Sequence, residues 1–385
     1  MAIATPLSVS GRWIIGADGR RVKLAGVNWA GAHEDAMTPA GLNLRHRDDI
    51  ARQIAAWGFN SVRFPFALET VAWKSPVASA GVAANPDLEG STPWQVYAAC
   101  VKALTGAGVM VIPNCHLLSP GWCCAQDDAN GLWWNQKWPA SAFTSTWQTV
   151  AAALADDPLV IGYDLKNEPR KATVNGKTYS PSWGDGDSRT DFRRMYSDTA
   201  TSILEADPRA LFFCEGLSFA GNLTGAPSKP VTPSAPSRVV YSLHDYSWFH
   251  PSGLSEGDYA KAMKKASGSL LADKKAPVWI GEFGDTNNGN LGGWLGNFLT
   301  WARKTDADWC WWQLDGTNVQ GTNPETGKRV MTLGQPASYG LFNPEWTGPS
   351  NQALLKALQA IQAPTAGPKV KARRRWLWFG RRTKR

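Results

Sequence analysis

The 385-residue sequence has no long hydrophobic run: no window approaches the length of about 18 apolar residues that a membrane-spanning helix requires. Residues 1–10 have neither a basic start nor an apolar core, so we expect no signal peptide in this sequence. A Gly-rich phosphate-binding turn is also missing, which argues against an open doubly wound sheet.

Cysteine and histidine are scarce, with six and five residues, and none are spaced as metal ligands usually are. We therefore expect no metal and no cofactor. Cys115, Cys214 and Cys310 lie in runs that we interpret as strands, where a buried free thiol is the simplest interpretation. Cys123 and Cys124 lie in a loop and could pair with other cysteines, which the sequence leaves open. Four loop acids are interpreted as solvated side chains in preference to calcium ligands: Asp127, Asp128, Asp185 and Asp187.

Acidic residues are absent from residues 369–385, where nine Lys or Arg residues occur. The formal charge of +8 thus leaves 8 − 9 = −1 for the rest of the chain, and we expect no nucleic-acid partner. We divide the chain into one folded domain, residues 1–362, and a basic, Trp-containing, disordered tail, residues 363–385. The tail aromatics Trp376, Trp378 and Phe379 suggest contact with an anionic membrane surface; a solvated tail or processing remnant is the alternative.

Apolar strand-like segments alternate with helical patterns along most of the sequence, which predicts a (β/α)8 TIM barrel with long catalytic-face loops. A short N-terminal β-hairpin, Arg12–Ile15 and Val22–Leu24, precedes it around a Gly-containing turn. The expected barrel strands are Leu24–Asn28, Asn60–Phe64, Gly108–Ile112, Leu159–Leu165, Ala210–Glu215, Arg238–Leu243, Ala276–Gly281 and Asp308–Trp312. The expected helices are Asp48–Trp57, Trp94–Ala107, Thr144–Ala155, Thr190–Ala206, Tyr259–Leu271, Leu291–Lys304 and Asn351–Ile361.

Polar and aromatic residues gather where six of these strands end, and in such barrels the carboxyl ends of the strands carry the chemistry. Each one alone has an ordinary explanation, such as a surface ion pair, a hydrogen-bonded cap or a packing residue. Their joint occurrence favours an active site. The residues are Arg63, His116, Asn167, Glu168, His244, Tyr246, Glu282 and Trp312.

These motifs, in their order and spacing, resemble the signature of glycoside hydrolase family 5, the cellulase-like retaining (β/α)8 glycosidases. The resemblance covers residues 12 to 362 approximately. The motifs are Val-Arg-Phe-Pro at Arg63, His116, Asn167-Glu168-Pro169, His244-Asp245-Tyr246, Glu282-Phe283-Gly284 and Trp312.

The resemblance implies a retaining double displacement with Glu168 as acid/base and Glu282 as nucleophile. It groups the other six residues as substrate-binding. Within that group Arg63 and Tyr246 would hydrogen-bond Glu282, and His244 would tune Glu168. Asn167 and His116 would bind sugar hydroxyls, and Trp312 would stack under the sugar being cleaved.

We expect a secreted or extracellular, monomeric endo-β-1,4-glucanase acting on a carbohydrate substrate. Other β-glycosidase specificities remain open, namely β-mannan, β-1,3-glucan and glycosylceramide. Transglycosylation and a non-catalytic carbohydrate-binding barrel are further alternatives.

Two long loops and two further acids complete these expectations. Residues 119–139 contain Trp122, Trp133, Trp134 and Trp138 beside the Cys pair and are expected to line the cleft; a self-packed lid is the alternative. Residues 225–237 are expected to form a surface loop. Glu215 and Asp315 are rated as minor substrate contacts at best.

Overall fold

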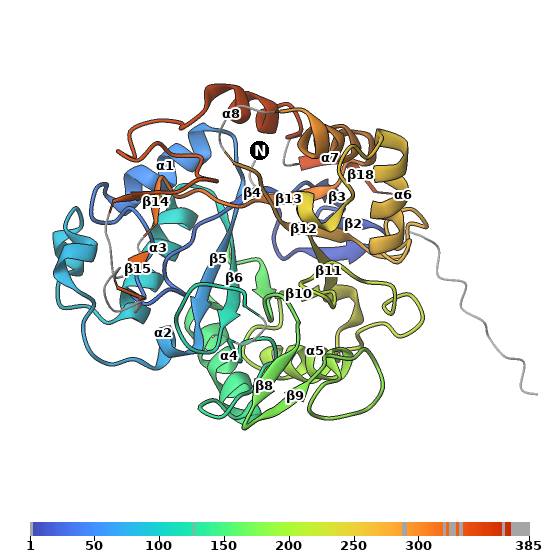
Figure 1. Cartoon of the computed structure of the whole chain (residues 1–385), viewed down its shortest axis with the longest axis horizontal. Helices are drawn as coiled ribbons and strands as arrows, with labels where there is room; N and C mark the ends of the chain where they lie inside the picture. Colours follow the sequence, from blue (N-terminus) through green and yellow to red (C-terminus); the bar gives the residue numbers. More distant parts are fainter. Residues whose placement is uncertain are drawn as a thin grey trace, which may run out of the picture.

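Eight parallel strands form a closed barrel in a computed structural model that describes residues 3–125, 128–286, 291–318, 321–322, 329–330, 334–363 and 366–370 (Figure 1). Around the barrel the order is β10-β11-β12-β13-β4-β5-β6-β7. The strands are β4 (Ala25–Asn28), β5 (Ser61–Ala67), β6 (Met110–Leu117), β7 (Gly162–Asp164), β10 (Leu211–Glu215), β11 (Val239–Asp245), β12 (Val278–Phe283) and β13 (Asp308–Trp311).

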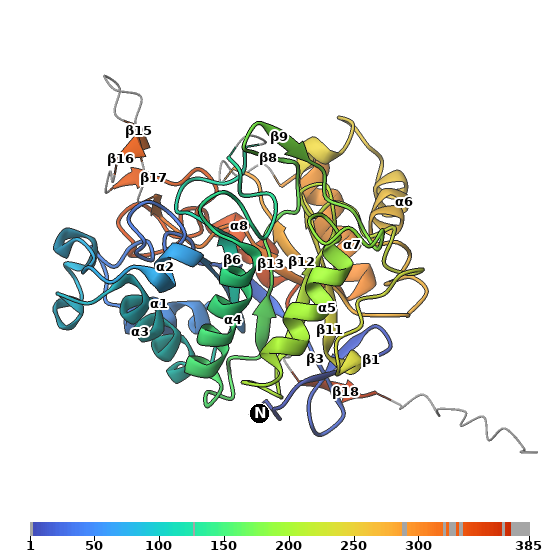
Figure 2. The same cartoon turned by 90° about the horizontal axis from the view of Figure 1, so that it is seen from below.

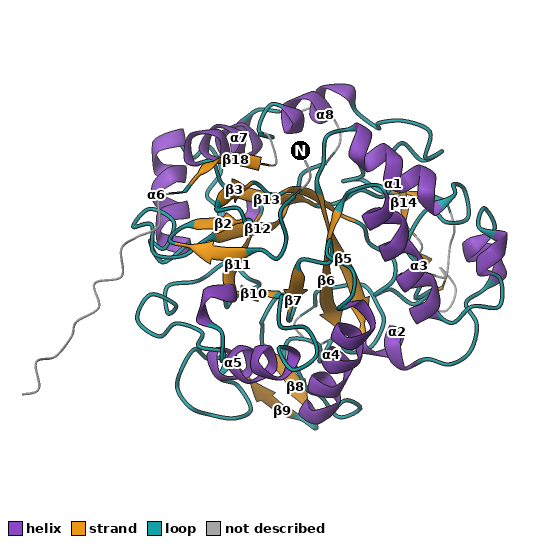
Figure 3. Ribbon diagram, turned by 180° about the vertical axis from the view of Figure 1, so that it is seen from behind, coloured by secondary structure: helices purple, strands orange, loops and turns teal. Residues whose placement is uncertain are grey.

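Helices surround the barrel, so the expected (β/α)8 architecture is confirmed (Figure 3). Between β10 and β11 only a single 3-10 turn, η3 (Pro236–Arg238), interrupts the described connection, where we expected a surface loop. The α-helices are α1 (Arg47–Ala56), α2 (Leu68–Ala72), α3 (Pro93–Gly106), α4 (Ala140–Leu154), α5 (Phe192–Ile203), α6 (Glu256–Ala266), α7 (Gly293–Thr305) and α8 (Gln352–Gln359). Among the described helices none is long and apolar enough to cross a membrane.

Helix α3 illustrates how local sequence starts an element. Thr92 is the N-cap residue: its hydroxyl accepts from the Gln95 backbone N–H, and the Gln95 side chain accepts from the Thr92 N–H. Pro93 occupies the first helical position, where no backbone N–H is needed. Buried residues recur at three- and four-residue spacing from Val96 to Leu104, and this face packs on the barrel.

A four-stranded sheet closes the amino-terminal end of the barrel, opposite the long loops (Figure 2). It contains the expected hairpin as β2 (Trp13–Ile15) and β3 (Arg20–Val22), together with β1 (Ser8–Ser10) and β18 (Ala366–Lys369). The expectation that the tail is disordered from residue 363 is therefore wrong for β18, which pairs with the edge of β3. Pro368 is tolerated because β18 is itself an edge strand. The basic and aromatic residues beyond residue 370 lie outside the described residues.

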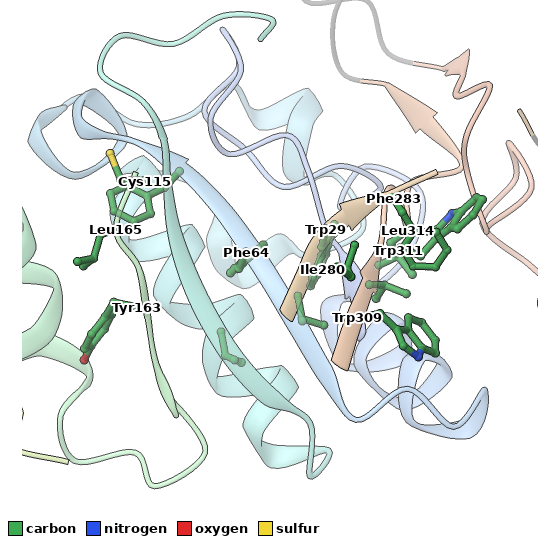
Figure 4. Close-up of a cluster of buried hydrophobic side chains, with 14 of the residues drawn as sticks. Trp29, Phe64, Cys115, Tyr163, Leu165, Ile280, Phe283, Trp309, Trp311 and Leu314 are labelled. Atoms are coloured by element: carbon green, nitrogen blue, oxygen red, sulfur yellow. The ribbon is translucent and has the colours of Figure 1, made fainter. Parts of the chain in front are cut away.

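Alternation along the barrel strands separates two environments. Outward-facing residues pack against the helices and form a large aromatic-rich core, part of which includes Phe64, Phe283 and Trp311 (Figure 4). Inward-facing Ile112 and Phe213 belong to a second apolar cluster with residues of the N-terminal sheet. Two residues further along the same strands, the interior becomes polar at Asn114 and Glu215, both fully buried. The strands thus carry an apolar floor beneath a polar layer at their carboxyl ends.

Shorter elements decorate the loops at the carboxyl end (Figure 2). They pair as three two-stranded antiparallel sheets: β8 (Ala172–Val174) with β9 (Lys177–Tyr179), β14 (Thr317–Asn318) with β17 (Gln335–Pro336), and β15 (Gly321–Thr322) with β16 (Arg329–Val330). Single 3-10 turns are η1 (Ser79–Val82), η2 (Pro86–Leu88) and η4 (Ser247–Phe249).

Candidate active site

Arg63 on β5 is the centre of the polar layer, and its side chain is fully buried. A guanidinium has five N–H donors, and acceptors are present for all five. Nε donates to Asp164 at 2.6 Å; Nη2 donates to Asn167 Oδ1 at 2.7 Å and to Glu215 at 2.9 Å; Nη1 donates to Asn28 Oδ1 at 3.0 Å and to Glu282. Because every donor is used within the protein, Arg63 fixes other side chains and has none left for a ligand.

Glu282 at the end of β12 accepts hydrogen bonds on both carboxylate oxygens. Oε1 accepts from Arg63 Nη1, and Oε2 accepts from the Tyr246 hydroxyl at 2.8 Å. His244 Nδ1 lies 3.4 Å from Oε2. Burial raises the pKa of Glu282, and the positive charges of His244 and Arg63 oppose that rise. These donors hold the carboxylate in one orientation.

Glu168 follows β7 with an uncommon backbone conformation, φ 44°. A non-glycine residue in this left-handed region is strained by about 1–3 kcal/mol, and the following Pro169 restricts it further. The Glu168 N–H donates to Glu215 Oε2 at 2.6 Å, which anchors the residue in this conformation. We had rated Glu215 as a minor substrate contact at best. The structure instead places it fully buried beneath Glu168, where it supports the Glu168 backbone.

His244 on β11 links three carboxyl groups. Its Nδ1 lies 3.0 Å from Glu168 Oε1, and its Nε2 lies 3.5 Å from Glu215 Oε1. Burial alone would lower the pKa of His244, but Glu282, Glu215 and Glu168 raise it to about 10. Burial alone would raise the pKa of Glu215, but His244 and Arg63 lower it to about 2. At neutral pH a buried imidazolium thus faces a buried carboxylate and both candidate catalytic glutamates.

The distance between Glu168 and Glu282 bears directly on chemistry. One carboxylate oxygen from each, together with a His244 ring nitrogen, lie within 4.8 Å of one another. Retaining glycosidases place two carboxyl groups about 5–5.5 Å apart, whereas inverting enzymes separate them by about 6.5–9.5 Å to admit a water molecule. The spacing here fits the retaining arrangement.

His116 on β6 is fixed by its neighbours in one tautomer. Asn114 Nδ2 donates to Asp164 Oδ2 at 3.0 Å, which turns Asn114 Oδ1 towards His116 Nδ1 at 2.8 Å. The His116 Nδ1–H is then the donor, so Nε2 carries the lone pair and faces Asn167 Nδ2 at 3.4 Å. Burial holds the pKa of His116 well below its usual value, so the ring is neutral. Trp312 stacks on this ring with centroids 5.4 Å apart.

A cleft of about 480 Å³ opens above these residues. Glu168 and Glu282 lie at its base, 9% and 4% exposed, with His116, Asn167, Tyr246 and Trp312. Three exposed aromatic side chains, Trp122, Trp248 and Phe249, line its upper walls. Trp248 stacks on Tyr246 at 4.4 Å between ring centroids and an angle of 7°, which leaves its outer face to solvent.

Residues 119–139 contribute Trp122 and the Cys pair to the cleft. The other three Trp residues pack against protein: Trp133 contacts Phe192, Trp134 donates to Arg189 O, and Trp138 donates to Ser119 Oγ. The loop therefore combines the two expected roles, a cleft wall and a self-packed lid.

The cysteines form one pair of neighbours and four single thiols. Cys123 forms a disulfide with Cys124 and with none of the other cysteines. The other four, at positions 100, 115, 214 and 310, are free and buried. Both sulfurs of the pair lie beside Asn167 Nδ2, at 3.3 Å and 3.5 Å, and Cys123 Sγ lies 4.0 Å from Glu168 Oε2. Sequence reasoning left this pairing open because no spacing rule identifies a disulfide between neighbours.

All eight predicted site residues meet at the carboxyl end of the barrel, but two occupy other positions than we expected. Arg63 and His244, grouped as substrate-binding, do not line the cleft, because they are buried beneath the two glutamates. Glu215 is the functional residue that sequence reasoning undervalued, although its position as an acid ending a strand was the right signal. Asp315 is also buried and does not line the cleft.

Two groups of side chains among the described residues have ligand-like spacing: His116 with Cys123 and Cys124, and Glu168 with His244 and Glu282. The second group does not fit a metal, because a protonated His244 has no lone pair to offer. The first group consists of soft ligands, two of them joined as a disulfide.

Comparison with known proteins gives consistent matches over most of the chain. A family model described as cellulase (glycosyl hydrolase family 5) matches residues 15–318. A glycosyl hydrolase 5 family protein from Chamaecyparis obtusa is 30% identical over 393 aligned positions, covering 94% of this chain and 67% of the relative. An endoglucanase from Paenibacillus polymyxa is 28% identical over 358 positions, covering 88% of this chain and 82% of the relative.

Solved structures also match over most of the chain. A hyperthermophilic endocellulase from the archaeon Pyrococcus horikoshii superposes with a TM-score of 0.75 at 25% identity, covering 93% of this chain and 99% of that one. A glutamate-to-alanine variant of the P. horikoshii endocellulase, in complex with cellotetraose, matches with a TM-score of 0.75 at 25% identity. This match covers 92% of this chain and 98% of that one.

Proposed function

The chain belongs to glycosyl hydrolase family 5 and is a cellulase-like glycoside hydrolase, and from this premise we propose that it is an endo-β-1,4-glucanase that retains anomeric configuration. The observation that carries the retaining assignment is the separation of at most 4.8 Å between carboxylate oxygens of Glu168 and Glu282. The relatives named endoglucanase and endocellulase support a β-1,4-glucan substrate.

In the first step a carboxylate oxygen of Glu282 attacks the anomeric carbon, and the bond to the leaving oxygen breaks as Glu168 protonates that oxygen. The product is a glycosyl ester on Glu282. Arg63, Tyr246 and His244 contact the Glu282 carboxylate, and they stabilise its negative charge before attack and again on departure.

In the second step Glu168, now a carboxylate, removes a proton from water, whose oxygen attacks the anomeric carbon and releases Glu282. The Glu168 carboxylate lies 3.0 Å from the protonated His244, and its backbone is anchored by Glu215. This support keeps one side chain correctly placed both as acid and as base, which double displacement requires.

Sugar rings would bind along the aromatic walls of the cleft. Asn167 and His116 offer hydrogen-bonding groups at its base, and Trp312 offers an indole face beside them. The exposed Trp248 and Trp122 provide further stacking surfaces away from the glutamates.

The test compares wild type with Glu282→Gln and Glu168→Gln on carboxymethylcellulose, β-mannan, β-1,3-glucan and aryl β-glucosides. We expect wild-type cleavage of the β-1,4-glucan and a loss of at least about 100-fold in each variant. NMR of the first product should show the β-anomer. An α-anomer first, or cleavage by Glu282→Gln at the wild-type rate, would exclude the proposed mechanism.

Transglycosylation would use the same glutamates with a sugar in place of water as acceptor, and product analysis at high oligosaccharide concentration separates the two. Activity on mannan, β-1,3-glucan or a glycosylceramide in place of β-1,4-glucan would refute the proposed substrate and leave the proposed double displacement unchanged. Sugar binding without turnover on any substrate would leave only the non-catalytic barrel.

Location, assembly and the tail are further proposals. A disulfide persists in oxidising surroundings, which supports a secreted or extracellular enzyme. We expect a monomer in light scattering. Contact of the basic tail with anionic membranes is tested by liposome sedimentation of the full chain and of a chain ending at residue 370; equal binding would exclude it.

A further inference from the structure

Asp164 on β7 is a fully buried acid that neither step of the proposed reaction uses. The surroundings of its two side-chain oxygens differ. Oδ2 accepts from Arg63 Nε at 2.6 Å and from Asn114 Nδ2 at 3.0 Å. Oδ1 is equally buried, and no N–H or O–H group of the described residues donates to it. An ionised carboxylate would therefore leave one charged oxygen buried without a donor, which is costly.

Glu215 on β10 is the neighbouring acid, and both of its oxygens have donors. Oε1 accepts from Arg63 Nη2 at 2.9 Å and faces His244 Nε2 at 3.5 Å, and Oε2 accepts from the Glu168 N–H at 2.6 Å. The side chains of Asp164 and Glu215 lie within hydrogen-bonding reach of each other. Two carboxylates offer acceptors alone, so a hydrogen bond between them requires a proton on one. The oxygen that lacks a donor is Asp164 Oδ1, and the proton fits there.

The charges around Asp164 also favour its neutral form. Burial and the negative charge of Glu215 raise the pKa of Asp164 well above its usual value, and Arg63 opposes this rise. Four further ionisable groups near it are buried with raised pKa values and are therefore neutral: Cys115 on β6, Tyr196 on α5, Cys214 on β10 and Cys310 on β13.

We infer that Asp164 is a protonated carboxylic acid in the folded protein at neutral pH, and that its Oδ1–H donates to the Glu215 carboxylate. Asp164 is thereby a positioning residue, because it fixes Arg63 on one side and Glu215 on the other without adding a charge. Glu215 in turn anchors the backbone of Glu168.

A neutral acid at this position keeps the buried charges balanced throughout the proposed reaction. The cations Arg63 and His244 then face two carboxylates at every stage. Glu215 is one of these carboxylates throughout. The other is Glu282 before attack and Glu168 once Glu282 carries the sugar. An ionised aspartate would add a third negative charge to this buried layer, where an uncompensated charge is costly. The balance rests on the proposed function, whereas the protonation does not.

Infrared difference spectroscopy of the full chain tests the protonation directly. The spectrum of wild type minus that of Asp164→Asn at neutral pH should contain the carbonyl band of a protonated carboxylic acid, and this band should shift in D₂O. Glu168, which the proposed mechanism also protonates, is present in both proteins and cancels. Carboxylate bands in the difference spectrum, in place of the acid band, would overturn the inference.

Enzyme assays test the positioning role with the matched variants Asp164→Leu and Asp164→Asn. Leucine offers Arg63 and Asn114 no acceptor, so kcat should fall at least about 10-fold. KM should change little, because Asp164 does not line the cleft. Asparagine offers an oxygen to these donors and an N–H to Glu215, as the protonated acid does, so it should recover most of the lost kcat.

The variants also separate failure of this inference from failure of the proposed function. An asparagine variant that is as impaired as the leucine variant, or that does not fold, would overturn the inference, because an ionised Asp164 would then be required. The infrared test needs no leucine variant, so it decides even if leucine prevents folding. A protein that shows the acid band but cleaves no glucan supports the protonation of Asp164 and counts against the proposed function.

Discussion

Replacing Arg63 with lysine tests whether its hydrogen-bond geometry, beyond its charge, holds the polar layer together. Arg63→Lys keeps a positive charge but offers three donors in place of five. At least two of the five acceptors named above, Asp164, Asn167, Glu215, Asn28 and Glu282, must lose their partner.

An acceptor left unsatisfied in a buried site costs about 1–3 kcal/mol, so two of them predict a loss of about 2–6 kcal/mol in the free energy of unfolding. Proteins are usually stable by about 5–15 kcal/mol, so the variant should still fold at room temperature. The kcat should also fall, because Glu282 loses a fixed donor, while KM changes less because Arg63 does not line the cleft.

Urea titration followed by tryptophan fluorescence gives the free energy, and glucanase assays give kcat and KM. The matched control is Arg47→Lys, where the guanidinium forms an ion pair with the half-exposed Asp87 and the loss should stay below about 1 kcal/mol. If Arg63→Lys lost no more stability than Arg47→Lys and kept the wild-type kcat, charge alone would be sufficient and the geometric argument would be refuted.

Three further predictions concern the same site. Glu215→Gln should lower kcat by up to about 100-fold with little change in KM, because Glu215 anchors the Glu168 backbone from outside the cleft; a KM effect alone would contradict this. The pKa of His244 is raised in the folded state, so its protonated form should stabilise the fold in full below about pH 6.5, and this contribution should disappear as pH rises through about 10. The difference in unfolding free energy between wild type and His244→Asn should fall over that range by at most about 1.4 kcal/mol per pH unit, and a difference independent of pH would exclude it. Trp248→Ala should raise KM for cello-oligosaccharides roughly 2- to 10-fold, whereas Trp73→Ala, exposed outside the cleft, should not; equal effects would argue against sugar stacking.

Much of the site was predictable because its residues end strands. Period-two alternation places Arg63 inside a barrel once the strands are identified, and the parallel arrangement brings the strand ends together. Strict alternation after Ile280 would turn Glu282 outward, and the irregularity of β12 between Ile280 and Phe283 turns it inward. The support given by Glu215 could not be predicted, since it depends on a backbone N–H from a neighbouring strand end and on the conformation of Glu168.

Two other features escaped prediction for different reasons. The segment Ala366–Lys369 contains Gly and Pro, which disfavour strands, and it forms β18 only because the edge of β3 is available. Cys123 and Cys124 lie in a long loop, and no local pattern reports that this loop folds back onto Asn167.

The N-terminal sheet has a consequence for engineering the chain. Ala4 O accepts from the Ala17 N–H, and the Val370 N–H donates to Gly19 O, so both ends of the described chain meet at one turn. This turn belongs to the N-terminal sheet, which lies at the opposite end of the barrel from β8 and β9 (Figure 2). A partner domain or a solid support attached through a short linker at either end of the described chain would therefore lie beneath the floor of the barrel. The cleft at the carboxyl ends of the strands would stay uncovered.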